Sequence, residues 1–377
     1  MKKIPLIKPD LPSLESVAGA FREILRTGKI TNFGRFVSLF EETAGAYLGG
    51  PSATVSSGTL GLVFTLQALG LKPGQKVIVP SFSFMASAQA ILYAGGIPVF
   101  ADIGPDMTLS PSDLERLLSK HKDATFVMPV HMFGHPCQVE KIQEITAGFA
   151  RGNRREIRVV YDAAHAFGSK KGARRVGTFG DAEVFSLSVT KALVCVEGGL
   201  VVSRNAPLIR RVKKMRNYGN GGHYDADGPG LNGKMSEFHA IIGLENLKRL
   251  EGSLSMRARK AGYYARRILQ KTCFQPIMGS AGIRHTYKDF TVLVPPELKG
   301  ERDAIVDFLN GRGVETRTYF HPPIHQQRFF RRFADRRLPA TEDLSRRVVT
   351  LPFFTTISEK TMDQVVRMLQ KAQRRVA

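Results

Sequence analysis

Strand-like and helix-like segments alternate through the first half of the chain, and this alternation constrains the fold more than any other feature. Short apolar runs that suit strands lie at 53–55, 76–80, 97–101, 124–130 and 157–161. After most of them comes a segment whose apolar residues have helical spacing. Alternation with short connections predicts a mainly parallel sheet with helices on both faces. A ligand site is then expected at the carboxyl ends of the strands.

The remaining segments extend this α/β pattern. Helices are expected over 12–27 and through Phe40 to Gly49, a basic loop over 151–155, a glycine-rich loop over 217–233, and helices over 236–250 and 256–269. From about residue 274 the pattern changes to an α+β unit, with strands over 288–294 and 314–319 and helices over 302–310 and 361–376. Because 377 residues suffice for two domains, we predict a large domain of residues 1–250 and a smaller C-terminal α+β domain of residues 251–377.

The composition excludes several classes of protein. No apolar stretch reaches membrane-spanning length, and prolines interrupt the N-terminal segment, which makes it a poor signal peptide. The cysteines Cys137, Cys195 and Cys273 are widely spaced, which argues against a disulfide framework and against a cysteine-rich metal site. No bound metal is expected, and a reducing cytoplasm is the simplest location.

The formal charge of +22 raises the question of nucleic-acid binding. The basic residues are spread, however, over 170–175, 210–216, 328–337 and 371–375, and neither zinc-finger spacing nor an aromatic and basic RNA signature accompanies them. Nucleic acid is therefore not favoured as a partner. A basic surface would also attract anionic small molecules such as nucleoside diphosphates.

Four polar or aromatic groups follow strand-like runs, and each has a structural and a functional interpretation. The turn Ser57-Gly58-Thr59 is an ordinary helix N-cap or a phosphate site. Phe84 belongs to the core or stacks on a planar cofactor. Asp162 and His165 are a helix cap and a core histidine, or a carboxylate and an imidazole in a site. Lys191, between the two apolar, strand-like runs of residues 184–202, is a solvated loop lysine or a Schiff-base lysine.

Together these groups are those that pyridoxal phosphate requires. Lys191 would hold the cofactor aldehyde as an internal aldimine and later move a proton. Asp162 would pair with the pyridine nitrogen, His165 would bond the ring hydroxyl, and Phe84 would stack on the ring. The phosphate would be held by Gly58, Thr59 and Ser186. Convergence of these groups at one sheet edge is stronger evidence than any one of them.

Ordered motifs along nearly the whole chain carry a resemblance to a known family. They include SSGTL (56–60), VIVPSFSFMASA (77–88), PVHMFGHP (129–136), VYDAAHAFGS (160–169), VGTFGDAEVFSLSVTK (176–191), RNYG (216–219), GLNGKMSEFHAIIGL (230–244) and ETRTYFHPPIH (315–325). In these motifs the chain resembles the sugar aminotransferases of the DegT/DnrJ/EryC1/StrS type, pyridoxal phosphate enzymes with the aspartate aminotransferase fold. His165 stands where glutamine is also common, and Lys234 stands where arginine is frequent.

The resemblance implies the same roles for the residues assigned above to the cofactor, and it adds a partner subunit. It implies that Asn232 reaches the cofactor phosphate of a neighbouring subunit, so that a homodimer is expected. It also implies L-glutamate as amino donor, a pyridoxamine phosphate (PMP) form of the cofactor, and a keto sugar linked to a nucleoside diphosphate as acceptor. By family frequency this sugar is a 4-keto-6-deoxy hexose, destined for amino-sugar biosynthesis.

Alternatives remain open at this point. Relatives with histidine in place of the catalytic lysine are dehydratases, which Lys191 argues against here, and other relatives act on cyclitols or aromatic precursors. A basic binding protein that kept the fold without the chemistry is a further alternative. Tyr319, His321 and His325 are candidates for sugar contacts, or they pack around the turn at Pro322-Pro323.

Overall fold

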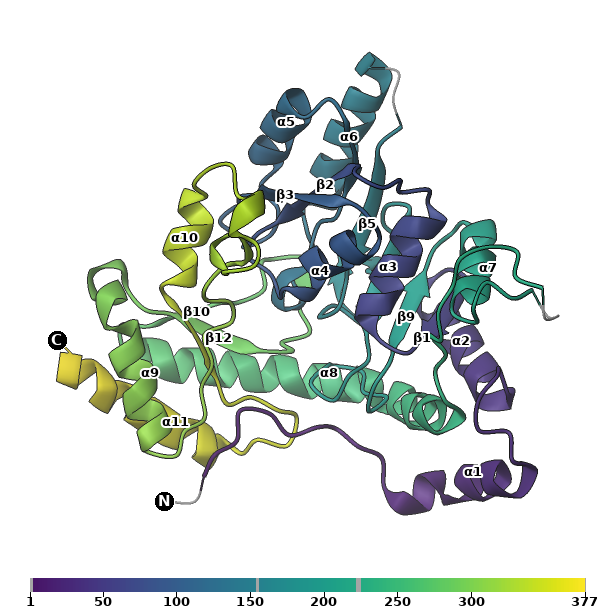
Figure 1. Ribbon diagram of the computed structural model, residues 1–377. Coiled ribbons are helices and arrows are strands. Elements are labelled where there is room, and N and C mark those ends of the chain that lie inside the picture. The colour runs from purple at the N-terminus through teal and green to yellow at the C-terminus, as the bar shows by residue number, and fades with distance from the viewer. Residues whose placement is uncertain (1–2, 154–155, 222–224, 377) are drawn as a thin grey trace.

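A seven-stranded sheet forms the centre of the molecule. The computed structural model describes residues 3–153, 156–221 and 225–376, and its sheet has the strand order β1-β9-β8-β5-β4-β2-β3 (Figure 1). The strands are β1 (Ser52–Val55), β2 (Lys76–Pro80), β3 (Ile97–Ala101), β4 (Ala124–Val127), β5 (Arg158–Asp162), β8 (Ala182–Ser186) and β9 (Gly199–Val202). The pairs from β3 to β8 are parallel, and β9 runs antiparallel to both β8 and β1. The expected mainly parallel sheet is confirmed.

Helices cover both faces of the sheet. In β2, Val77 and Val79 belong to one hydrophobic core and Ile78 to another, because successive side chains of a strand point to opposite faces. One face is covered by α3 (Gly58–Ala68), α4 (Ala86–Tyr93) and α7 (Ala206–Met215), and the other by α2 (Arg35–Leu48), α5 (Pro111–Lys120) and α6 (Val139–Asn153). This double burial explains why the strands read as apolar runs.

The two helices expected over 236–250 and 256–269 are one continuous helix, α8 (Glu237–Lys271). The sequence Gly252-Ser253 suggests a break, but burial continues in helical register across it. Leu254 packs in the core of the sheet, whereas Tyr264 packs in the core of the C-terminal part. The predicted boundary between residues 250 and 251 thus falls inside a helix that both parts share, and the two-domain division stays a prediction.

The C-terminal part holds a small antiparallel sheet of β10 (Gln275–Pro276), β12 (Phe290–Leu293) and β13 (Val348–Leu351), packed on α9 (Arg302–Gly311) and α11 (Glu359–Val376). The strand expected over 314–319 is wrong. Val314 and Arg317 form only single bridges, to Ile4 and Thr350, and two prolines follow within a few residues. The N-terminal segment lies against this part, since Phe353 donates a backbone hydrogen bond to Leu6.

Further elements are α1 (Leu14–Thr27), α10 (Pro339–Ser345) and a three-stranded sheet of β11 (Ile283–Arg284), β6 (Lys170–Lys171) and β7 (Arg174–Arg175), besides short 3-10 helices. Residues 154–155 of the expected basic loop and 222–224 of the expected glycine-rich loop lie outside the described residues, and Arg151 belongs to α6. Within the described ranges, no helix is both long and apolar enough to cross a membrane.

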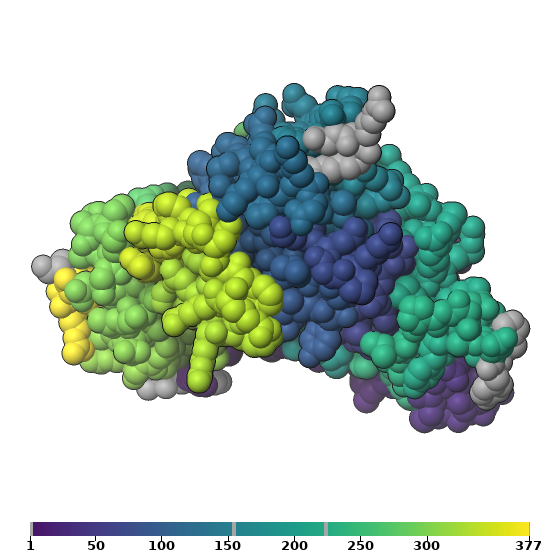
Figure 2. Space-filling view, turned by 45° about the horizontal axis from the view of Figure 1, so that its top comes forward, coloured from purple at the N-terminus to yellow at the C-terminus, as the bar shows by residue number. Residues whose placement is uncertain are grey.

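The segment between β12 and α11 crosses back onto the large sheet. Figure 2 shows this yellow-green segment seated against blue residues from the first half of the chain. Ile324 N–H donates to the Ser81 carbonyl oxygen at 3.0 Å, and Ala340 N–H donates to Asp102 at 3.1 Å. Tyr319 and Phe320 are thereby held over the carboxyl ends of the strands.

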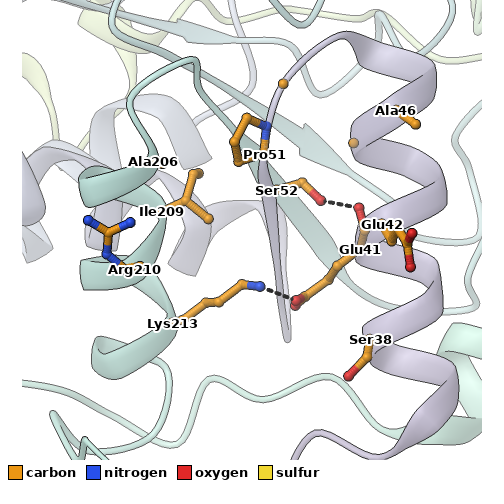
Figure 3. A pocket seen from close by; sticks show the side chains of 12 residues that line it. Ser38, Glu41, Glu42, Ala46, Pro51, Ser52, Ala206, Ile209, Arg210 and Lys213 are labelled. Atoms are coloured by element: carbon orange, nitrogen blue, oxygen red, sulfur yellow. Dashed lines mark hydrogen bonds and ion pairs between the residues drawn. The ribbon is translucent and has the colours of Figure 1, made fainter.

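The free edge of β1 is closed by charged side chains from α2 and α7. Thr54 N–H donates to Glu41 at 2.9 Å, and Arg216 donates to the Thr54 carbonyl oxygen at 2.6 Å. Figure 3 shows Lys213 reaching from α7 to Glu41, with an Nζ–O distance of 2.7 Å. Burial opposes the charge of Glu41, but Arg216 and Lys213 outweigh it and lower the pKa of the carboxyl group. This network satisfies backbone groups at the open edge of β1 and so protects the edge.

Replacement of Glu41 by glutamine is expected to lower the free energy of unfolding by about 3 kcal/mol, because the buried guanidinium of Arg216 loses its counter-charge. Urea unfolding measures this change. Glu42, the exposed neighbour on α2, is the matched control, and Glu42→Gln is expected to change the stability by less than about 0.5 kcal/mol. Equal losses for the two variants would contradict the network.

Candidate active site

A cavity of about 400 Å³ lies at the carboxyl ends of β5 and β8, beneath the segment that crosses from the C-terminal part. Nine of the residues singled out in the sequence line it: Ser57, Gly58, Thr59, Phe84, Asp162, His165, Ser186, Lys191 and Tyr319. Lys288 and Phe320 complete the wall from the C-terminal part. The structure therefore brings together the amine, the carboxylate, the imidazole and the hydroxyl groups that the sequence pattern places at strand ends.

Lys191 lies in the loop between β8 and β9. Its backbone N–H donates to the Ser188 carbonyl oxygen at 3.0 Å, which makes a tight turn that presents the side chain to the cavity. Burial, with a further contribution from Lys288, lowers the pKa of Lys191 to about 7 against the opposing effect of nearby carboxylates. Close to neutral pH a large fraction of this amine is uncharged and nucleophilic.

Asp162 ends β5, and its two carboxylate oxygens are fixed by different donors. Ser87 Oγ donates to Oδ2 at 2.7 Å, and Ala164 N–H donates to Oδ1 at 3.0 Å. Ser83 Oγ lies 3.0 Å from Ser87 Oγ and extends this chain of hydroxyl groups. The sequence interpretation missed both serines. Ser83 precedes α4 and Ser87 lies in its first turn, and this spacing of four residues is a signal that two hydroxyls can share a face.

The turn before α3 is both a helix N-cap and part of the cavity wall, so both interpretations of its sequence apply. Ser57 is a true N-cap, because its Oγ accepts from Leu60 N–H at 3.2 Å. Gly58 and Thr59 in the same first turn line the cavity beside Ser186. A Cβ on Gly58 would lie 3.1 Å from Ser186 Cβ, and one on Gly199 would lie 2.6 Å from the Ser57 carbonyl. Glycine at both positions lets the turn pack directly on β8 and β9.

His165 is buried, 7% exposed, and among the described residues its Nδ1 has no hydrogen-bond partner. Burial, followed by Lys191 and Lys288, lowers the pKa of His165 well below its ordinary value, so the ring is neutral at pH 7. Phe84 is 52% exposed at the cavity, which makes its interpretation as a core residue wrong. An unpartnered imidazole nitrogen and an open aromatic face are thus both available to a ligand.

These groups fit pyridoxal phosphate. The amine of Lys191 suits the cofactor aldehyde, and the oriented carboxylate of Asp162 suits the ring nitrogen. The unpartnered nitrogen of His165 suits the ring oxygen, and the hydroxyl-lined turn at the N-terminus of α3 suits the phosphate. No cluster of histidine, cysteine and acidic side chains suited to a metal ion occurs among residues 3–153, 156–221 and 225–376.

Three predicted site residues lie away from this cavity. Asn232 is exposed in a separate depression with Thr31, Lys234 and His239. His325 is buried: its Nδ1 lies 2.6 Å from Ser81 Oγ, and its Nε2 faces Glu342 at 3.5 Å. The structure corrects the expected sugar contact of His325, because the ring holds the crossing segment on β2.

His321 lies on the same crossing segment, and its Nδ1 is 3.4 Å from Ser345 Oγ. It is not among the residues that line the cavity, and its contact with the sugar stays a prediction. Of the three residues offered for sugar binding, Tyr319 alone lines the cavity, and its contact with substrate stays a prediction.

Comparisons with known proteins identify the family of the chain. A model of the DegT/DnrJ/EryC1/StrS aminotransferase family matches residues 14–370. The chain is 31% identical over 352 residues to a UDP-N-acetyl-3-dehydro-alpha-D-glucosamine 3-aminotransferase of Acidithiobacillus ferrooxidans, with 91% of this chain and 92% of the relative covered. It is 30% identical over 375 residues to a dTDP-4-amino-4,6-dideoxy-D-glucose transaminase of Escherichia coli, with 98% of each chain covered.

Solved structures give the same result. A crystal structure of DesI in the presence of its TDP-sugar product superimposes with a TM-score of 0.91 and 29% identity, over 99% of this chain and 94% of that chain. Fold, site and comparisons together define a pyridoxal phosphate-dependent aminotransferase. The chain belongs to the DegT/DnrJ/EryC1/StrS aminotransferase family, which confirms the resemblance seen in its motifs.

Proposed function

We propose that this protein transfers an amino group from L-glutamate to a keto sugar linked to a nucleoside diphosphate, with pyridoxal phosphate bound through Lys191. The observation that supports the proposal best is the placement of Lys191, with a pKa of about 7, in one cavity with the oriented carboxylate of Asp162. The substrate class rests on relatives named for UDP- and dTDP-linked sugars.

Each of the chain's own groups has a distinct task in this reaction. Pyridoxal phosphate supplies, when bound, the electron sink that stabilises the negative charge left by removal of a substrate proton. The uncharged amine of Lys191 takes that proton and returns it to a different carbon. Asp162, held by Ser87, would keep the ring nitrogen protonated, and His165 would donate to the ring oxygen.

The cofactor phosphate and the cofactor ring have their own contacts. The hydroxyls of Thr59 and Ser186 and the backbone at Gly58 would hold the phosphate. Phe84 would cover one face of the ring. Tyr319 and Phe320 close the cavity from the crossing segment, and this position would bring the sugar between the two parts of the chain and exclude water.

The position of the new amino group separates two groups of relatives. The Acidithiobacillus enzyme is named for amination at C3 and the Escherichia coli enzyme for a 4-amino sugar. We propose a 4-keto-6-deoxy hexose as the acceptor, with a 3-keto sugar as the competing candidate.

A panel of UDP-, dTDP- and GDP-linked 3-keto and 4-keto sugars, each with L-glutamate, tests the function. We expect one amino sugar and one equivalent of 2-oxoglutarate per turnover, detected by mass spectrometry and a coupled dehydrogenase assay. Loss of a sugar hydroxyl without release of 2-oxoglutarate would instead identify a dehydratase. Cyclitol and aromatic ketones are added to the panel, and turnover of these ketones without turnover of any nucleotide sugar would overturn the proposed substrate class.

We further propose a homodimer in which Asn232 reaches the cofactor phosphate of the partner subunit. The exposed position of Asn232, outside the cavity of its own chain, supports this arrangement. Sedimentation analysis tests the dimer, and weaker cofactor binding by Asn232→Ala tests the contact. A cytoplasmic location is also proposed, because Cys137, Cys195 and Cys273 are free thiols.

A further inference from the structure

Lys288 is a second amine in the candidate active site. It comes just before β12 in the C-terminal part of the chain, and it lines the same cavity as Lys191. Its side chain is only 5% exposed. Because a buried ammonium group is costly, its presence beside another lysine calls for a physical explanation.

The ammonium group of Lys288 is held in one place. It donates to both carboxylate oxygens of Asp289, at 2.8 and 2.9 Å, and lies 5.4 Å from the centre of the Tyr319 ring. The backbone is fixed as well, because the buried guanidinium of Arg257 on α8 donates to the carbonyl oxygens of Tyr287 and Lys288 at 2.8 and 3.0 Å. Lys288 is therefore a fixed charge at the cavity wall.

This arrangement argues against a simple anion-binding role for Lys288. A carboxylate or phosphate of a substrate would have to displace Asp289, whose two oxygens already satisfy the ammonium group. The charge of Lys288 can still act through space on a neighbouring amine, since two cations in one poorly solvated cavity disfavour each other.

The groups around Lys191 show the direction of this effect. The carboxylates of Asp289, Asp162 and Glu197 favour the protonated form of Lys191, whereas Lys288 disfavours it and is the strongest of these charges. His165 also faces Lys191, but it is neutral at pH 7. Lys288 thus acts on Lys191 in the same direction as burial, and Asp289 opposes it.

We propose that Lys288 is a positioning residue for amino transfer: its fixed ammonium group, held by Asp289 at the wall of the same cavity, adds to the effect of burial in favouring the uncharged form of Lys191, which is the form that can bond the cofactor aldehyde. This inference rests on the proposed role of Lys191 as the cofactor-binding lysine. The charge comes from the C-terminal part of the chain, so the reactivity of Lys191 depends on correct packing of that part on the sheet.

Competitive labelling of the cofactor-free, full-length protein with acetic anhydride tests the proposal. The extent of Lys191 acetylation, measured by mass spectrometry across pH, reports the fraction of uncharged amine. The wild-type midpoint is expected near pH 7, and Lys288→Met is expected to raise it by about one pH unit or more. Lys288→Arg keeps the charge and should keep the low midpoint.

Two further variants complete the design. Lys299→Met removes an exposed lysine from the same part of the chain and should leave the midpoint unchanged. Lys288→Met combined with Asp289→Asn avoids an unpaired buried carboxylate, and it should still raise the midpoint, by less than Lys288→Met alone. The double variant keeps the test valid should the single variant fail to fold.

An unchanged midpoint in folded Lys288→Met or in the double variant would overturn the proposal. A midpoint raised equally by Lys288→Arg would do the same, because the effect would then come from packing and not from charge. The labelling requires neither glutamate nor a nucleotide sugar. A failed substrate panel would therefore refute the proposed function without affecting this measurement.

Discussion

Replacement of Lys191 by alanine is expected to abolish covalent attachment of the cofactor and to lower the rate of amino transfer by at least about 10³-fold, because one side chain supplies both the nucleophile and the general base. Wild-type holoenzyme should absorb visible light, and borohydride should fix the cofactor to the peptide that contains Lys191. The variant should lose both signals. Absorbance spectra, peptide mass spectrometry and release of 2-oxoglutarate provide the measurements.

Two companion variants make the result specific. Lys191→Arg keeps a positive charge but cannot serve as the same nucleophile, so it should be as inactive as Lys191→Ala. Lys248→Ala removes an exposed lysine from α8 and should match the wild type. A Lys191→Ala protein that still transaminates at the wild-type rate, with cofactor fixed elsewhere, would show that another amine performs the reaction.

Replacement of Asp162 by asparagine is expected to lower the rate of amino transfer by on the order of 10²-fold, because a neutral amide no longer favours a protonated ring nitrogen and nearby charges shift pKa values by about 1–3 units. Borohydride should still fix the cofactor to Lys191, since Asp162 takes no part in that bond. The variant thus separates cofactor capture from proton transfer. Single-turnover rates of 2-oxoglutarate release from the loaded protein give the measurement.

The hydrogen-bond chain behind Asp162 provides a graded control. Ser87→Ala removes one donor but keeps the carboxylate, and it should slow transfer by about tenfold, the value of one hydrogen bond to a charged group. Asp123→Asn removes an exposed carboxylate after α5 and should have no effect on the rate. If Asp162→Asn and Ser87→Ala reduced activity to the same small extent, an electrostatic role for Asp162 would be ruled out.

Local sequence patterns predicted the sheet well and the C-terminal part less well. The boundaries expected for β2 and β3 agree with the structure, because each apolar run is bounded by turn residues and buried on both faces. The expected break between residues 250 and 256 failed because burial on two successive cores outweighs the weak helix propensity of glycine and serine. The expected strand over 314–319 failed because only single bridges are available to it.

The residues of the candidate site also fall into those that the sequence predicted and those that only the structure revealed. By itself, the sequence determined the residues that follow parallel strands, such as Asp162 and Lys191, because carboxyl ends of parallel strands meet at one edge whatever the remaining packing. Only the tertiary structure decided that His325 anchors a crossing segment and that Lys288 and Phe320 enter the cavity. These residues reach the site through contacts between distant parts of the chain, for which no local periodicity is a signal. The tertiary structure also decided the charges around Lys191, since these include the Lys288–Asp289 ion pair of the C-terminal part.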